Sequence, residues 1–305
     1  MAIRLAVHVG PHKTGSTSVQ RALGANRDRL EAAGVLYPPS LPDAEFPGQH
    51  ADLAGLLAAG AVDRMQAWLA EAHATARARG CDTLLLSSEN FRAPTIRREL
   101  VRMQRRYRRE TGGDTRLLYV RRDQAALAKS QVIARLDGEL GFFFRERYDL
   151  RGWAADFLHQ QRQEERFFAR HGGRFVDLAT TPPAALTAEL LRLATDRDFS
   201  FIETGRENVT SSRLAAPPAA MAAYGLRVMQ KISGGNPIVG VTAQAAANQA
   251  EPEPGLPGYQ ELVAAFDAAV ATAIAEGFAD ARRETVWHYR WRLLRRHLRE
   301  LRRLW

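Results

Sequence analysis

The chain begins with a short apolar stretch, a tight turn and a run of small hydroxyl residues, an order that few folds accommodate. Residues 3–9 are apolar or β-branched at most positions, which is typical of a short buried strand. Gly10 and Pro11 end that strand, and residues 16–23 favour a helix. The first N–H groups of a helix lack partners and lie at the positive end of its dipole, so they attract an anion. The sequence therefore predicts an anion-binding turn between the strand and the helix.

A lysine stands inside this turn, although the chain uses arginine for nearly all of its basic residues. The lysines are Lys13, Lys129 and Lys231, within a total of 43 basic residues. A compact ammonium differs chemically from a planar guanidinium fork, which favours a chemical role for Lys13 over a general positive charge. Nucleotide triphosphate loops place their lysine directly after the second glycine. Here Lys13 precedes Gly15, which disfavours a nucleotide or small-molecule kinase.

Predicted strands and helices alternate along the first two thirds of the chain. The strands are predicted at residues 3–9, 82–90, 115–121 and 173–178. The helices are predicted at residues 16–33, 50–60, 62–79, 95–109, 123–136, 149–171 and 182–195. This alternation favours an α/β fold with a central parallel sheet flanked by helices on both faces. Residues 34–48, between the first two predicted helices, contain four prolines and are predicted to form a long surface loop.

The last third of the chain is less regular. Residues 251–258 carry three prolines and two glycines, which indicates a linker. We therefore expect one α/β domain over residues 1–250 and a C-terminal helical extension over residues 259–305. The extension ends in an arginine-rich amphipathic helix that packs on the domain or continues it.

Polar side chains follow three of the predicted strands. Lys13 follows the first strand, Glu89 the second and Arg122 the third, and the carboxyl ends of parallel strands share one edge, where ligands bind. Glu89 ends an apolar strand, so we expect partial desolvation to raise its pKa toward that of a base near neutrality. His50, after the proline loop, is a competing base. His12 lies inside the turn, where it can touch ligand oxygens.

Two segments together resemble the sulfotransferases that use 3′-phosphoadenosine 5′-phosphosulfate, most closely their bacterial sulfotransferase-like branch. The first resembles their 5′-phosphosulfate loop and consists of Pro11, His12, Lys13, Thr14, Gly15, Ser16, Thr17 and Ser18. The second resembles their 3′-phosphate motif, an arginine at a strand end with a serine eight residues later, here Arg122 and Ser130. The resemblance covers roughly residues 3–180 and implies a P-loop-like three-layer fold.

The resemblance implies transfer of a sulfuryl group to a hydroxyl or amine of a glycan, lipid or small-molecule acceptor, with 3′-phosphoadenosine 5′-phosphate as product. Lys13 then neutralises the leaving oxygen, backbone N–H groups of residues 14–17 hold the 5′-phosphosulfate, and Glu89 takes the acceptor proton. No metal is needed. One departure is that the late glycine loop of many relatives has no clear match; Arg206, Arg213 and residues 231–235 are the candidates.

Composition narrows the class of protein. The net charge is +9, but residues 282–305 hold nine arginines and two glutamates, which is +7 of it. The rest is nearly neutral, which argues against a nucleic-acid-binding domain. The single cysteine, Cys81, excludes an intrachain disulfide and a cysteine-based metal cluster. A strand that begins at residue 3, with no apolar run long enough to span a membrane, predicts a cytoplasmic protein.

The C-terminal segment leaves several interpretations open. An apolar stripe at helical spacing is formed by Trp287, Trp291, Leu294, Leu298, Leu301 and Trp305, with arginines between them. The stripe is consistent with packing or self-association, with peripheral binding to a membrane surface, or with steering of an acidic acceptor. A non-catalytic basic adaptor is therefore the alternative to a sulfotransferase. The acceptor pocket is expected near the proline loop, residues 142–144 and Tyr148.

Overall fold

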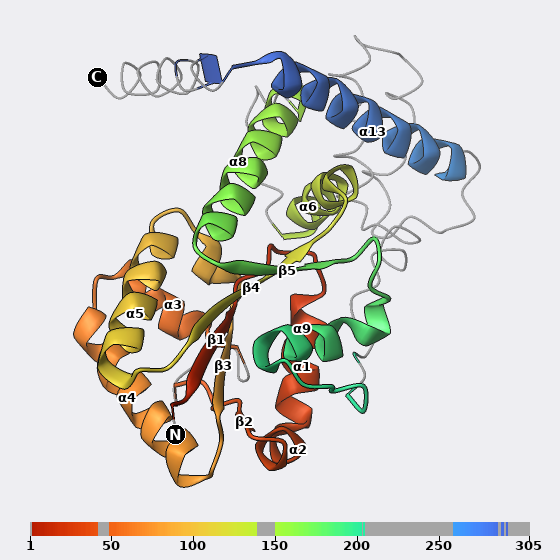
Figure 1. Cartoon of the computed structure of the whole chain (residues 1–305). Coiled ribbons are helices and arrows are strands. Elements are labelled where there is room, and N and C mark those ends of the chain that lie inside the picture. Colours follow the sequence, from red (N-terminus) through yellow and green to blue (C-terminus); the bar gives the residue numbers. More distant parts are fainter. Residues whose placement is uncertain are drawn as a thin grey trace. The chain divides into compact units, whose positions relative to one another are not determined.

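The computed structural model describes residues 2–41, 49–138, 150–202, 204, 259–285, 288–289 and 291 (Figure 1). The chain divides into two compact units, the first formed by residues 1–123 and 164–208, the second by residues 124–163 and 209–305. The predicted boundary between residues 250 and 259 lies outside the described residues and stays a prediction.

The first unit contains a five-stranded sheet in which all strand pairs are parallel, in the order β2-β3-β1-β4-β5. The strands are β1 (Arg4–His8), β2 (Val35–Leu36), β3 (Thr83–Ser87), β4 (Thr115–Arg121) and β5 (Gly173–Asp177). The central strand β1 therefore lies between β3 and β4. The predicted α/β class with a parallel sheet is confirmed.

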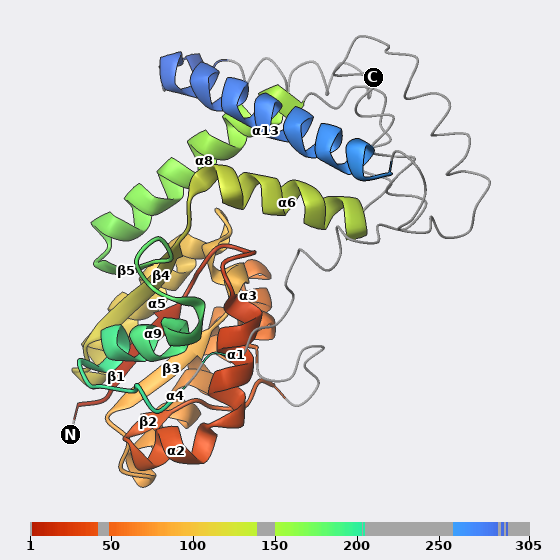
Figure 2. The ribbon, with the colours of Figure 1, turned by 90° about the vertical axis from the view of Figure 1, so that its right-hand side faces the viewer.

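Helices cover both faces of this sheet (Figures 1 and 2). One face carries α3 (Ala51–Ala58), α4 (Val62–Ala78) and α5 (Ile96–Thr111), and the other α1 (Ser16–Ala25), α2 (Arg27–Ala32) and α9 (Leu186–Thr195). A short 3-10 turn, η1 (Glu89–Arg92), follows β3, and a second, η2 (Pro183–Ala185), precedes α9. Because side chains alternate along a strand, Leu84 and Leu86 enter one core and Leu85 the other.

The sequence missed two local features of the first unit. The predicted helix over residues 16–33 is two helices that meet at Asn26, whose side-chain amide donates to the carbonyl oxygen of Ala22 (2.8 Å). The two-residue strand β2 lies inside the predicted loop and pairs with the start of β3. Gly34, at φ 81°, turns the chain into β2, a conformation that favours glycine.

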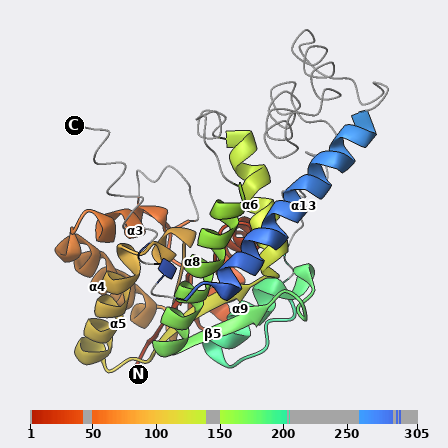
Figure 3. The same cartoon turned by 90° about the horizontal axis from the view of Figure 1, so that it is seen from above.

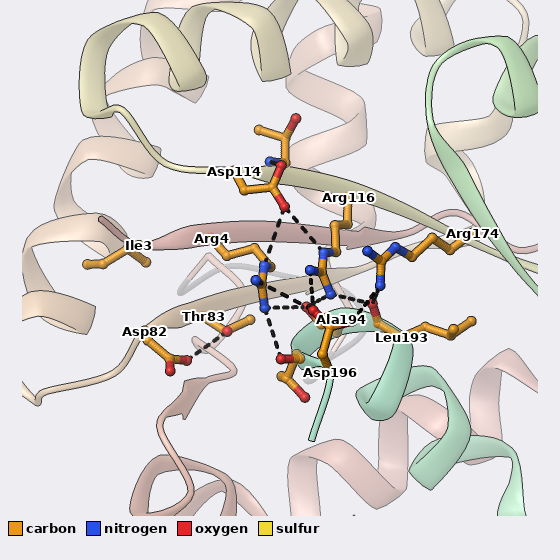
Figure 4. A network of polar contacts seen from close by, with 12 residues as sticks. Ile3, Arg4, Asp82, Thr83, Asp114, Arg116, Arg174, Leu193, Ala194 and Asp196 are labelled. Atoms are coloured by element: carbon orange, nitrogen blue, oxygen red, sulfur yellow. Dashed lines mark hydrogen bonds and ion pairs between the residues drawn. The ribbon is translucent and has the colours of Figure 1, made fainter. Parts of the chain in front are cut away.

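At the amino ends of the strands, three arginines cap the last turn of α9 (Figure 4). Arg4, Arg116 and Arg174 come from β1, β4 and β5 and donate to the carbonyl oxygens of Leu193, Ala194 and Thr195 at 3.0–3.3 Å. Arg116 and Arg174 also bind the carboxylate of Asp196, the left-handed residue (φ 64°) that ends the helix. Their hydrogen bonds hold the pKa of Asp196 well below its usual range.

The described part of the second unit contains the helices α6 (Gln124–Gly138), the first two thirds of α8 (Leu150–Arg170) and α13 (Tyr259–Arg283) (Figure 3). Leu127, Leu158 and Ile274 are among the buried residues that join the three helices. Arg151 of α8 pairs with Asp280 of α13 at 2.5 Å. Most of the predicted amphipathic stripe lies outside the described residues; of its members, the structure describes Trp291, which is exposed. Among the described residues, no helix combines the length and the apolar character needed to cross a bilayer.

Candidate functional site

Lys13, Glu89 and Arg122 all follow the carboxyl ends of neighbouring strands. The strands β3, β1 and β4 are adjacent and parallel, so the segments that leave them share one edge of the sheet. Two contacts join these segments. The Arg122 guanidinium donates from Nη1 to the carbonyl oxygen of Lys13 at 2.6 Å, and the Glu89 carboxylate forms an ion pair with Nδ1 of His12. The predicted convergence of three strand ends at one edge is confirmed.

The turn between β1 and α1 has an unusual backbone. Lys13 has φ 68° and Gly15 has φ 87°, both in the left-handed region. For a lysine this conformation costs on the order of 1 kcal/mol, and such strain often marks a functional site. The hydroxyl of Thr14 donates to the carbonyl oxygen of Pro11 at 2.7 Å and is buried. The Thr14 side chain therefore stabilises the turn.

The N-terminus of α1 has no side-chain cap among the described residues. Gly15 stands at the capping position, and over the described length of this helix no side chain caps the first turn and no acidic residue lies in it. The first bond of the helix runs from the Val19 N–H to the Gly15 carbonyl (3.0 Å), so the N–H groups of residues 16–18 have no partner within the helix. Uncapped N–H groups beside Lys13 are what a phosphate or phosphosulfate group requires.

Two consecutive arginines at the end of β4 have different environments. Arg121 lies over the Phe175 ring, 3.8 Å from its centroid, and forms an ion pair with Glu165 at 3.7 Å. Arg122 instead reaches the loop at Lys13. Burial lowers the pKa of Arg122, and the charge of Asp123 partly offsets this effect. Of the two, Arg122 is the guanidinium at the predicted donor site.

A buried histidine that the sequence analysis did not single out lies beneath the turn. His8, the last residue of β1, has its Nδ1 2.9 Å from the hydroxyl of Ser87 at the end of β3, and its Nε2 has no hydrogen-bond partner among the described residues. Burial lowers its pKa to about 4, against a smaller opposing effect of the Glu89 charge. A histidine inside an otherwise apolar strand was the signal for it.

The environment of His50 does not suit the competing base that the sequence suggested. It is fully buried at the start of α3, where Nδ1 accepts from the Ser87 N–H at 3.0 Å and Nε2 donates to the Pro38 carbonyl at 3.2 Å. Burial lowers its pKa to about 4. Because both ring nitrogens have backbone partners, this geometry gives His50 a structural role in place of the competing base.

Glu89 is partly buried, as expected, but the expectation of a raised pKa is wrong. Burial alone would raise it; the hydrogen bond and charge of His12, followed by smaller effects of Ser16 and His8, together lower it below the ordinary value. The Glu89 side chain is 18% exposed and that of His12 is 47% exposed. The Glu89 carboxylate is thus ionised and pairs with the more exposed imidazole of His12.

For some predicted site residues, the structure does not show a position at this edge of the sheet. Ser130 is buried on α6 of the second unit, so its pairing with Arg122 stays a prediction. Other predicted residues lie outside the described ranges: Arg206, Arg213, residues 231–235, residues 142–144, Tyr148 and part of the proline loop.

Comparison of the chain with protein-family models, with curated proteins and with solved structures found no match. The functional conclusion therefore depends on the geometry of the edge formed by the turn, η1 and the end of β4.

Proposed function

We propose that this protein is a sulfotransferase with a P-loop-like fold, which moves a sulfuryl group from 3′-phosphoadenosine 5′-phosphosulfate to a hydroxyl or amine. One observation carries the proposal: the strained Lys13 turn at the uncapped N-terminus of α1 is hydrogen-bonded to Arg122, which follows the neighbouring strand. This arrangement suits a ligand that carries two separate anionic groups.

The two anionic groups of such a donor match two parts of the site. The N–H groups of residues 16–18 and the Lys13 ammonium suit the 5′-phosphosulfate, since a helix N-terminus and a mobile cation both favour negative charge. The Arg122 fork suits the 3′-phosphate, which it can bind through two parallel hydrogen bonds. On this proposal Ser130 adds a hydroxyl to the 3′-phosphate.

The chemistry follows from the same residues. The acceptor oxygen attacks sulfur in line with the bridging oxygen, whose bond to sulfur breaks. Lys13 stabilises the negative charge that develops on the bridging oxygen, and the N–H groups of the turn hold the phosphosulfate in place. The acceptor proton passes to the pair formed by His12 and Glu89. The acceptor is a glycan, a lipid or a small molecule.

Calorimetric titration with 3′-phosphoadenosine 5′-phosphate tests the proposal. We expect the wild type to bind without added metal, and Arg122→Ala to lose roughly 10- to 100-fold in affinity, because a charged hydrogen bond is worth about 1.5–3 kcal/mol. Arg121→Ala is the matched control and should bind like the wild type, since its guanidinium lies on Phe175.

Titration with ATP and magnesium provides the contrast. Binding of ATP but not of the bisphosphate would refute the sulfotransferase proposal in favour of a kinase. Binding of neither nucleotide would refute it in favour of a non-catalytic adaptor that works through its arginine-rich C-terminal segment.

A further inference from the structure

We propose that His12 is the base that takes the acceptor proton and that Glu89 is a positioning residue that orients the imidazole. This inference rests on the proposed sulfuryl transfer and assigns the two members of the His12–Glu89 pair different roles.

The first argument is accessibility. Nearly half of the His12 side chain is exposed, at 47%, whereas 18% of the Glu89 side chain is exposed. The imidazole lies in the turn next to Lys13, the residue proposed to neutralise the leaving oxygen. An acceptor that approaches from solvent therefore meets the imidazole before it meets the carboxylate.

The second argument is the way each residue is held. Glu89 begins η1, a turn in which the Ser88 hydroxyl accepts from the Asn90 N–H (3.2 Å) and Phe91 is fully buried. The backbone N–H of Ser88 donates to the carbonyl oxygen of His8 (3.1 Å), which fixes η1 to the end of β1. Glu89 is thus anchored in the scaffold, as an orienting group must be.

The third argument is electrostatic. The groups around the Glu89 carboxylate lower its pKa, so it is ionised and a weak base. An imidazole is the side chain best suited to proton transfer near neutral pH. A carboxylate that accepts a hydrogen bond from Nδ1–H fixes the tautomer with a lone pair on Nε2 and stabilises the imidazolium that forms.

The proposed step balances as follows. The acceptor O–H proton moves to His12 Nε2 while the oxygen lone pair forms the new bond to sulfur. The bond from sulfur to the bridging oxygen breaks, and its electron pair leaves with the 5′-phosphate. The imidazolium, paired with the Glu89 carboxylate, then releases its proton to solvent.

Nitrogen-15 NMR of the histidine rings tests the orientation without turnover. His12→Asn identifies the signals of His12, which are then recorded at alkaline pH, where imidazoles are neutral. We expect the Nδ1–H tautomer in the wild type and a shift toward the Nε2–H tautomer, favoured by a free imidazole, in Glu89→Ala. A wild-type His12 that carries its proton on Nε2 would overturn the inference.

Single-turnover kinetics tests the base. The probe is 3′-phosphoadenosine 5′-phosphosulfate with water as the acceptor, and the product is 3′-phosphoadenosine 5′-phosphate. We expect His12→Ala to lose roughly 100-fold or more in rate, with partial rescue by imidazole added to the buffer, and Glu89→Gln to lose less. His171→Ala, which removes an imidazole before β5, is the matched control and should keep its rate.

The two proposals fail in different ways. A larger loss in Glu89→Gln than in His12→Ala, without rescue by imidazole, would identify Glu89 as the base and overturn this inference alone. Failure of the wild type to bind the bisphosphate would overturn the sulfotransferase proposal itself. Where turnover with water is too slow to follow, the tautomer of His12 decides the assignment.

Discussion

The turn after β1 is fitted closely around the side chain that precedes it. A Cβ atom placed on Gly10 would lie 2.7 Å from Nε2 of His8, and His8 cannot withdraw easily because its Nδ1 is hydrogen-bonded to Ser87. The glycine is therefore required for space. The close contact between Gly10 and His8 thus fixes where the chain starts toward Lys13.

We expect Gly10→Ala to lower the free energy of unfolding by roughly 1–3 kcal/mol, because the new methyl group overpacks the site, and to weaken binding of the bisphosphate. Gly24→Ala is the matched control. A Cβ atom on Gly24, inside α1, meets no atom within 4 Å from the described residues beyond its own helix backbone, so the substitution should raise stability by roughly 0.5–1 kcal/mol. Urea denaturation and calorimetry measure both effects, and equal stability of the two variants would contradict the described packing.

How far the sequence specifies the site is clearest at single residues. It placed Lys13, Glu89 and Arg122 at one edge correctly, because parallel topology alone brings strand ends together. It misjudged the pKa of Glu89, because nothing in the local sequence shows that His12 contacts the carboxylate. It also could not show that both nitrogens of His50 have backbone partners, since Pro38 and Ser87 meet this ring only in the folded chain.

At the level of elements, the C-terminus of α9 is held by the arginine cluster of Figure 4. Its last carbonyl oxygens would otherwise lack partners, and a helix end carries partial negative charge that favours cations. Arg116 is the most deeply placed member, with 7% of its side chain exposed. The cluster therefore ties the helix to three strands at once.

We expect Arg116→Met to lower the free energy of unfolding by about 1–3 kcal/mol, because it removes the most deeply buried donor to the helix end and, of the donors that the structure describes, leaves Arg4 and Arg174 to bind it. Binding of the bisphosphate by the folded variant should be unchanged, since the cluster lies at the amino ends of the strands. Arg192→Met, which breaks a surface pair with Glu189 on the same helix, should cost below about 0.5 kcal/mol. Thermal denaturation compares the two, and similar losses would refute the capping role.

Elements with strong boundary signals were predicted closely from sequence. The strand predicted at residues 115–121 is found at those residues, because a glycine pair precedes it and a change to polar residues follows it. The strand β2 was missed because two residues show no periodicity, and its pairing with β3 is a long-range contact. The break at Asn26 was missed because the helical pattern continues on both sides of it.

At the scale of the whole molecule, folding buries two histidines that must stay neutral. Burial lowers the pKa of His8 and that of His50 to about 4, from an ordinary value of 6.5. In the unfolded chain both imidazoles take up protons as the pH falls below 6.5, whereas in the folded chain they do so only near pH 4. The stability that they confer is thus complete above pH 6.5 and is lost between pH 6.5 and 4.

We expect the wild type to lose stability over this pH range, with each histidine contributing at most roughly 3 kcal/mol. His8→Asn keeps a partner for Ser87 but has no titrating ring, so its stability should fall less steeply with decreasing pH. His288→Asn, at an exposed position, is the control and should follow the wild type. Guanidinium denaturation at a series of pH values gives the slopes; parallel curves for the wild type and His8→Asn would contradict the burial of a neutral His8.

The arginine cap on α9 has a consequence for how this protein can change over evolutionary time. The cap binds helix carbonyls at one edge of the sheet, while the proposed chemistry occupies the opposite edge. Mutations around the turn and η1 that alter acceptor preference would then leave the hydrogen bonds of the arginine cap intact. Directed-evolution libraries aimed at new acceptors should therefore leave Arg4, Arg116 and Arg174 untouched and diversify the segments that follow β1, β3 and β4.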